Sequence, residues 1–217
     1  MKFWDLISRG YFNGSPTYLY FSILVMLFVV GYACGSLNFA IIISKKYYGE
    51  DIRKVGSKNA GFTNMLRIYG KKAAALTMLG DFLKTFIICL AGRFLLGDSG
   101  ACIAGLGCVI GHAFPVYYGF RGGKGVLATA SMLLVLNPIV LAFLLIIFII
   151  IVAATKYVSL GSIMCALIMP LLLSKLGESN VFVIIPGLII TVLVVFLHRE
   201  NIKRLLEGTE SKLNLKK

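Results

Sequence analysis

The stretch PIVLAFLLIIFIIIVAAT at 138–155 is an apolar run of 18 residues without a charged side chain. As an α-helix it would be about 27 Å long at 1.5 Å per residue, close to the ~30 Å hydrocarbon core of a bilayer. The whole chain is 59 % hydrophobic and 14 % charged, whereas soluble domains are about half apolar and about a quarter charged. The sequence therefore predicts an all-α integral membrane protein.

Asn137-Pro138 separates this run from the apolar stretch before it. Asn-Pro is a turn signal, and the two runs together are too long for one crossing. The same reasoning along the chain predicts seven transmembrane helices in a single domain covering 1–217, the first of them uncleaved. The predicted spans are 17–43, 73–96, 101–118, 126–137, 138–155, 158–176 and 181–198, followed by a tail at 199–217.

Positive charge gathers on one side of this arrangement. Seventeen of the 22 Lys and Arg residues lie at 44–72, 119–125, 156–157 and after His198. The other side holds three, which are Lys2, Arg9 and Lys175. The positive-inside rule makes the richer side cytoplasmic, with the N-terminus outside and the C-terminus inside. Because topology accounts for much of the net charge of +13, no nucleic-acid partner is expected.

The five cysteines all lie in apolar spans, and none forms a CxxC pair. We expect small buried side chains rather than disulfides or metal ligands. No metal or other cofactor is expected. These residues are Cys34, Cys89, Cys102, Cys108 and Cys165.

The first cationic segment, at 35–67, combines Gly35-Ser36 with a loop rich in Gly, Ser, Asn and cations. Glycine lets backbone N–H groups converge on an anion, and Arg offers phosphate a fork of donors. Ser36 is predicted inside the first span, where it either bonds the preceding turn's carbonyl or faces a polar site. The loop either is a solvated basic segment or binds phosphate through Arg53, Ser57, Asn59, Thr63, Asn64 and Arg67.

The second segment is GHAFPVYYGFRGGKGV at 111–126. Its residues Gly122, Gly123, Lys124 and Gly125 resemble a phosphate loop but lack the P-loop spacing and the Ser or Thr after the Lys. A Gly-flanked Lys that opens a helix still favours anions through the helix dipole and free N–H groups. His112, higher in the third span, is interpreted as structural.

Two further segments place polar side chains on helix faces. Ser159 and Ser162 share a face at the start of the sixth span, and capping of that helix by Ser159 is the alternative. His198, Asn201 and Arg204 follow at three-residue intervals where the last span leaves the bilayer, although His198 could simply be interfacial. In the second span Asp81 and Lys84, three residues apart, can pair with each other or line the site.

Taken together, these motifs resemble the bacterial acyl-phosphate-dependent glycerol-3-phosphate acyltransferases. The resemblance runs from Gly35 to Glu210, and its ordered spacing is more specific than any single motif. It rests on five motifs in order. The first two are Gly35-Ser36 and DIRKVGS at 51–57, the latter followed by Asn59, Gly61, Thr63-Asn64 and Leu66-Arg67. The others are GH at 111–112 with FPV at 114–116 and GGKGV at 122–126, then VSL at 158–160 with Ser162, and finally HR at 198–199 with NI at 201–202, RL at 204–205, Gly208 and Glu210. Two positions depart from the family: Lys58 stands where Gly is expected, and Leu127 where the family continues directly to Ala-Thr.

The resemblance implies a seven-helix protein of the bacterial inner membrane with its active site at the cytoplasmic face. It implies transfer of a fatty acyl group from acyl phosphate to the 1-hydroxyl of sn-glycerol-3-phosphate. The products are lysophosphatidic acid and phosphate, in the first step of phospholipid synthesis. Coenzyme A is not the donor.

The residues support this chemistry independently. Acyltransferases that use coenzyme A carry His-x4-Asp, but Tyr117 and Lys203 stand five residues after the two histidines. An acyl phosphate is already activated, so its reaction needs bound phosphates, neutralised charge and a weak base near the hydroxyl. We expect Ser36, His198 and Asn201 at the reacting groups, with His198 or a donor phosphate oxygen as the base.

The competing class is a transporter of an anionic, phosphate-bearing solute. It would place polar residues through the membrane midplane and often show an internal repeat. Here polar residues gather at the predicted cytoplasmic ends, and no repeat is apparent. We therefore favour the acyltransferase.

Overall fold

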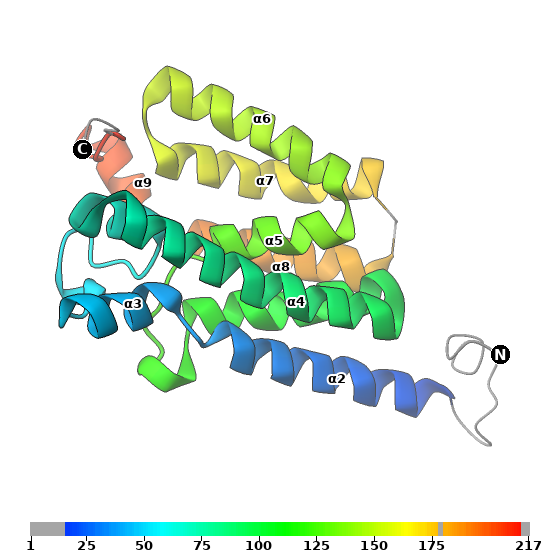
Figure 1. Cartoon of the computed structure of the whole chain (residues 1–217). Coiled ribbons are helices and arrows are strands. Elements are labelled where there is room, and N and C mark those ends of the chain that lie inside the picture. The colour runs from blue at the N-terminus through cyan, green and yellow to red at the C-terminus, as the bar shows by residue number, and fades with distance from the viewer. Residues whose placement is uncertain (1–15, 178–179, 214–217) are drawn as a thin grey trace.

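The computed structural model describes residues 16–177 and 180–213 (Figure 1). These residues form α-helices and short 3₁₀ turns, and no strand. The elements are α2 (Pro16–Gly35), α3 (Phe39–Tyr48), η1 (Ile52–Lys54), α4 (Phe62–Ala113), η2 (Val116–Tyr118), α5 (Val126–Leu136), α6 (Pro138–Thr155), α7 (Val158–Leu176), α8 (Val181–Leu197) and α9 (Arg199–Leu206).

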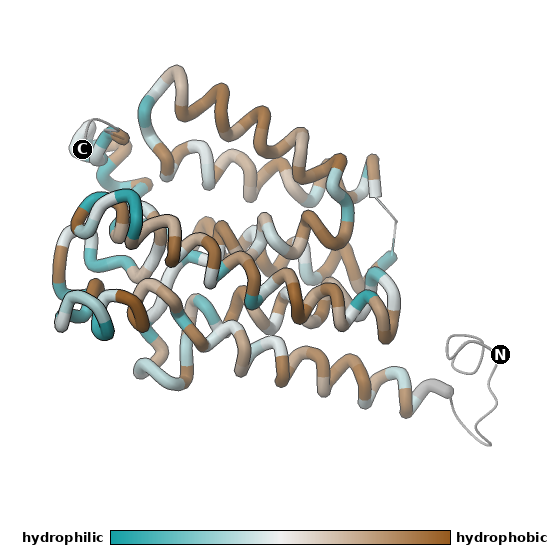
Figure 2. The backbone as a smooth tube through the Cα atoms, in the orientation of Figure 1, coloured by the Kyte–Doolittle hydropathy of each residue, from teal (hydrophilic) through white to brown (hydrophobic). Residues whose placement is uncertain are grey.

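The helices form an apolar bundle of membrane-spanning dimensions. By length and hydropathy, four helices of the described residues could cross a membrane, or five if the bent pair α8 and α9 is one span. Figure 2 shows many hydrophilic residues at the end of the bundle where α3, the loop after it and α9 lie. An all-helical membrane fold with a polar end is thus confirmed.

The helix expected over 17–43 is broken in the structure. Helix α2 ends at Gly35, and α3 begins at Phe39. Asn38 causes a new start, because its Oδ1 accepts from Ile41 N at 3.1 Å and its Nδ2 donates to Ala60 O at 3.3 Å. Asparagine is among the strongest N-caps. Ser36 therefore lies in the break between two helices rather than inside a continuous span.

Helix α4 contains two breaks and folds back on itself. Gly70 (φ 81°) and the pair Leu96-Gly97 (φ −133° and 61°) have non-helical backbone. Across the second break the chain is in backbone contact, since a Cβ on Gly92 would meet the carbonyl of Gly100. The predicted spans 73–96 and 101–118 correspond to the two arms of this hairpin, although the second arm ends at Ala113 and continues as loop and η2.

The later elements follow the sequence closely. Helices α6 and α7 occupy the predicted ranges 138–155 and 158–176, while α5 and α8 each end one residue early. Asn137 is the turn that was predicted, because its Oδ1 accepts from Ile139 N and Val140 N, each at 3.1 Å. The five cysteines are unpaired, and three of them are buried.

Small residues let α2 pack directly on the last arm of α4. Such contacts drive helix association in membranes, where lipid is as apolar as the side chains. The phenol of Tyr32 also donates to Phe114 O at 2.9 Å, so the end of α2 is fixed beside the end of α4. Glycines Gly31 and Gly35 face the backbone of Ala104 and Cys108, and Gly107 and Gly111 face that of Phe28 and Tyr32.

Lys58 adopts a left-handed backbone conformation with φ 58°. The family resemblance led us to expect Gly here, a residue that reaches this region without the steric cost of a Cβ. The left-handed backbone gives that expectation a physical reason.

Replacing Lys58 by Gly should raise the free energy of unfolding by about 1 kcal/mol, because the left-handed penalty is removed. Thermal unfolding in detergent measures the change. Lys54→Gly is the matched control, since Lys54 is an exposed lysine of the same loop without a positive φ. That variant should destabilise the protein, and a gain of stability in both would refute the argument.

Candidate active site

Asn64 organises the loop that precedes α4. Its Nδ2 lies 3.0–3.2 Å from the carbonyl oxygens of Ile52, Val55 and Asn59, and its Oδ1 accepts from Ser57 N at 3.0 Å. The side chain is buried, and its polar atoms are engaged inside the loop. Asn64 therefore shapes the segment that presents Ser57 and Asn59.

The other candidates on this segment lie on its outer side. Ser57 and Arg67 are exposed, and Asn59 and Thr63 are partly exposed. Thr63 and Arg67 stand one turn apart at the start of α4, so both belong to the same polar end of the molecule.

Arg53 joins two loops of the polar end. Its Nε and Nη2 donate to the carboxylate of Asp51, at 2.9 and 2.7 Å, and its Nη1 donates to Tyr118 O at 2.6 Å and to Arg121 O at 2.9 Å. Hydrogen bonding from Arg53 lowers the pKa of Asp51 to about 2. Asp51 was not predicted, although it begins the DIRK motif.

The glycine segment packs against the end of α4. Gly122 N donates to Ala113 O and Gly123 N to His112 O, each at 3.0 Å. Gly125, with φ 78°, is the N-cap of α5, so Lys124 stands just before a helix N-terminus as predicted. Two of the loop's N–H donors are already used, and the Lys124 ammonium is therefore its main group for an anion.

Lys124, Asn201 and Glu210 form a continuous polar chain. The ammonium of Lys124 donates to Asn201 Oδ1. The amide of Asn201 in turn donates to Glu210 Oε1 at 2.6 Å. Ser159 Oγ also donates to Glu210 Oε1, at 2.7 Å, and Arg204 Nε donates to Glu210 Oε2 at 2.7 Å. One carboxylate thus bonds three predicted residues from α7 and α9, and Lys124 joins them through Asn201.

Glu210 itself was not predicted as a site residue, although it ends the last motif. The chain turns after α9 at Gly208, which has φ 71°, and Glu210 N donates to Arg204 O at 3.1 Å. This return places the carboxylate against α7. Capping of α7 by Ser159 was the wrong alternative, because that helix has no side-chain cap and Ser159 bonds Glu210 instead. Ser162, one turn on, donates to Val158 O at 2.9 Å.

Cations dominate this cluster. Burial lowers the pKa of Lys124 to about 8, and the charges of Arg204 and Arg67 act in the same direction, while Glu210 opposes them. Burial raises the pKa of Glu210, but hydrogen bonds from Asn201, Arg204 and Ser159 lower it below its ordinary value overall. The site is an excess of positive charge arranged around one ionised carboxylate, which suits an anionic ligand.

His198 stands at the bend of 53° between α8 and α9, and it is buried. Its Nδ1 lies 2.8 Å from Val194 O. A carbonyl can only accept, so Nδ1 carries the proton and Nε2 of the neutral ring has a free lone pair. Asn201 follows one turn later and is also buried.

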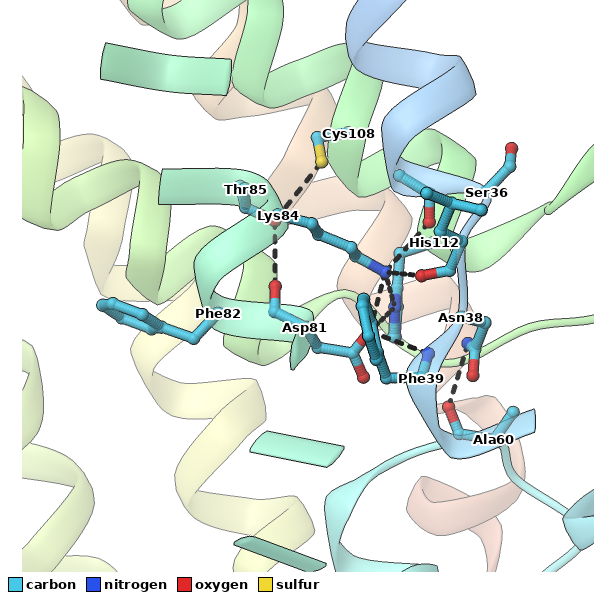
Figure 3. Close-up of polar contacts among 12 residues, drawn as sticks. Ser36, Asn38, Phe39, Ala60, Asp81, Phe82, Lys84, Thr85, Cys108 and His112 are labelled. Atoms are coloured by element: carbon cyan, nitrogen blue, oxygen red, sulfur yellow. Dashed lines mark hydrogen bonds and ion pairs between the residues drawn. The ribbon is translucent and has the colours of Figure 1, made fainter. Parts of the chain in front are cut away.

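Ser36 belongs to a different group of contacts. Its Oγ donates to Tyr32 O at 2.8 Å, as in the alternative expected for it, and accepts from Val116 N at 3.4 Å. Lys84, which pairs with Asp81 at 2.7 Å, donates to the neighbouring carbonyls of Gly35 and Leu37 (Figure 3). The described contacts do not join Ser36 to His198 or Asn201.

An apolar cavity of about 80 Å³ lies between α5, α6, α7 and α8. Val126, Ser162 and Val194 line it on the side of the cationic cluster, each within about one helical turn of Lys124, Ser159 or His198. Leu133, Leu141 and Met169 line it farther along the helices. The cationic cluster therefore adjoins an apolar space.

Among the residues that the structure describes, no three His, Cys, Asp or Glu side chains gather in a way that could hold a metal ion. The donors of the cluster are cations, amides and hydroxyls around a single carboxylate, a set that suits phosphate and not a metal.

The sequence and the fold both match known proteins. A family model described as glycerol-3-phosphate acyltransferase matches residues 25–208. A glycerol-3-phosphate acyltransferase of Finegoldia magna is 42 % identical over 199 residues, which is 90 % of this chain and 98 % of the relative. One of Clostridioides difficile is 42 % identical over 203 residues, or 89 % and 97 % of the two chains.

Solved structures agree. The crystal structure of PlsY, an integral membrane glycerol 3-phosphate acyltransferase, in its glycerol 3-phosphate form is 37 % identical with a TM-score of 0.83, and the match covers 88 % of this chain and 96 % of that one. The lysophosphatidic acid form is 34 % identical with a TM-score of 0.80 and the same coverage. This chain belongs to the glycerol-3-phosphate acyltransferase family.

Proposed function

We propose that this protein transfers a fatty acyl group from acyl phosphate to the 1-hydroxyl of sn-glycerol-3-phosphate and releases lysophosphatidic acid and phosphate. The observation that carries the proposal is the cationic cluster of Lys124 and Arg204 beside an apolar cavity. The reaction joins a phosphate-bearing polar substrate to an acyl chain. The cationic cluster can bind the phosphate, and the adjoining apolar cavity can bind the acyl chain. Relatives that share about nine-tenths of the chain carry the name of this activity.

The phosphates are assigned to Lys124, Arg204 and Arg67, with the loop of Ser57, Asn59 and Thr63 as further donors. Ser159 and Ser162 would join them only by turning their hydroxyls away from Glu210 and Val158 O. Arg53 acts mainly by holding its loop in position, since most of its donors bond Asp51 and two backbone carbonyls. One N–H of Nη2 is left over and can reach a phosphate oxygen. The acyl chain is assigned to the apolar cavity between α5, α6, α7 and α8.

The chemical step is direct attack. The 1-hydroxyl oxygen of glycerol-3-phosphate bonds the acyl carbonyl carbon, the bond from that carbon to the donor phosphate breaks, and the hydroxyl proton passes to a phosphate oxygen or to His198 Nε2. Asn201 orients the reacting groups. Because acyl phosphate is already activated, positioning and charge neutralisation supply most of the rate.

An acyl-enzyme on Ser36 is the alternative route. Its hydroxyl bonds Tyr32 O and Val116 N, and none of these contacts is to a base. This supports direct attack, with Ser36 holding the break between α2 and α3 beside the site.

The test is an assay of the purified protein. Acyl phosphate with glycerol-3-phosphate should give lysophosphatidic acid and phosphate, whereas acyl-coenzyme A should give no product. Rapid quench without glycerol-3-phosphate should leave no acylated protein. A stoichiometric adduct that disappears in Ser36→Ala would establish the covalent route instead.

The KM for glycerol-3-phosphate should change with pH as the ammonium of Lys124 loses its proton. Burial lowers its pKa to about 8, so its charge is present below that pH and lost above it. If phosphate binding needs the charge, the KM for glycerol-3-phosphate should rise about fivefold from pH 8 to pH 9. Lys124→Arg stays charged and should show no such rise, whatever its absolute KM. An equal rise in both proteins would remove Lys124 from the site.

The finer topology completes the proposal: seven crossings of the bacterial inner membrane, with the N-terminus outside and the active site and C-terminus in the cytoplasm. Single cysteines at Lys54 and Lys212, in a variant without the native cysteines, should resist an impermeant maleimide in intact cells. A cysteine at Lys175, exposed near the opposite end of α7, should react. Labelling at Lys54 or Lys212 from outside would reverse the orientation.

A further inference from the structure

Three titratable side chains, Asp81, Lys84 and His112, are buried together near the break between α2 and α3 (Figure 3). Asp81 and Lys84 are 1 % and 5 % exposed at their side chains, and His112 is 7 % exposed. Lys84 Nζ lies 2.7 Å from Asp81 Oδ1 and 3.2 Å from His112 Nδ1. Buried ion pairs contribute little net stability compared with apolar side chains, so their presence in a membrane protein points to a function.

One side of this trio holds the break between α2 and α3. Lys84 Nζ donates to Gly35 O at 3.0 Å and to Leu37 O at 2.8 Å. Phe39 N, at the start of α3, donates to Asp81 Oδ1 at 3.3 Å. A helix end inside the bilayer leaves backbone groups without partners, and an unpaired group there is costly. The ion pair supplies those partners at the position of Ser36.

The other side of the trio supports the glycine segment. His112 O accepts from Gly123 N at 3.0 Å. A Cβ on Gly123 would collide with His112 Nε2, and one on Gly122 would collide with His112 O. The ring and the carbonyl of His112 are therefore the surface on which Gly122 and Gly123 rest, directly before Lys124.

Lys84 Nζ approaches His112 at Nδ1, and since an ammonium can only donate, Nδ1 is the acceptor of that contact. Asp81 Oδ1 lies 3.5 Å from the same nitrogen, so the ring is held from its Nδ1 side while Nε2 faces Gly123.

We propose that His112, held by Lys84 and Asp81, is a positioning residue for the reaction. It fixes the position of the 122–125 loop, and therefore of Lys124, relative to the break between α2 and α3 at Ser36. The inference rests on the proposed function for its kinetic consequence, but the positioning of an anion site by His112 can be measured without turnover.

The experiment compares two variants of the full-length protein that test separately the ring of His112 and its hydrogen-bond acceptor toward Lys84. His112→Asn keeps an acceptor toward Lys84 and removes the part of the ring beneath Gly123. His112→Phe keeps the ring and removes the acceptor, while Lys84 retains three other partners. Thr85→Val is the control, because Thr85 is buried on the same helix and bonds Asp81 O and Cys108.

We expect His112→Asn to raise both the KM and the Kd for glycerol-3-phosphate about tenfold, and His112→Phe and Thr85→Val to change them less than about threefold. A tenfold change corresponds to about 1.4 kcal/mol. Unfolding temperatures are measured alongside. If His112→Asn lowers only the unfolding temperature and the apparent kcat, with KM and Kd unchanged, His112 is structural and the inference fails. Equal shifts in the Asn and Phe variants also overturn it.

The same contact can be probed from its other side. Gly123→Ala adds a methyl group that would collide with His112 Nε2, so it should raise the Kd as His112→Asn does. Should His112→Asn not fold, this variant decides: an unchanged Kd overturns the inference. Calorimetric binding of glycerol-3-phosphate to the unmodified protein separates the two proposals, because binding without acyl transfer would reject the proposed reaction and leave the positioning test intact.

Discussion

The Glu210 carboxylate is the anion on which the arrangement of the site depends. Lys124, Arg204 and Arg67 repel one another, and they come from a loop, the tail helix and the start of α4. Glu210 accepts from Ser159, Asn201 and Arg204 and so holds α7 and α9 together. Removing this carboxylate would leave the three cations uncompensated, although solvent screens part of the repulsion because the Arg204 side chain is 38 % exposed. One anion inside a cationic cluster fixes its shape and leaves positive charge for a ligand.

A second charged centre, formed by Asp81, Lys84 and His112, serves the backbone. Lys84 bonds carbonyls that the end of α2 leaves free, and His112 supports Gly123. The two centres meet in the loop at 122–125, whose residues rest on His112 and whose Lys124 reaches Asn201. Because both ends of this short loop are constrained, the position of the ammonium follows from the packing of α4 against α2.

Hydropathy predicted most of the helices because a bilayer imposes a length. The run 138–155 became α6 without change, and Asn137 formed the predicted turn. The break at 36–38 was missed, since apolar residues on both sides hide it. The Asn38 cap bonds Ile41 N locally, but the other end of its amide bonds Ala60 O, far along the chain. The sequence did not predict how the candidate site residues pair with one another. The bond of Ser159 to Glu210 spans 51 positions, and although Glu210 ends the last motif, the local sequence does not show which side chains it would bond.

Arg53 shows why residue type alone cannot assign a role. A guanidinium in a Gly- and Asn-rich loop suits phosphate, but the same fork suits a carboxylate and backbone carbonyls, and Asp51 lies two residues away. An arginine that is bonded on both sides to loops gives up most of its donors to hold their shape. Lys124 differs because its buried ammonium bonds an amide oxygen, which is a weaker partner than a carboxylate. A phosphate would therefore displace Asn201 from Lys124 more easily than Asp51 from Arg53, while the bond from the Asn201 amide to Glu210 keeps Asn201 in place.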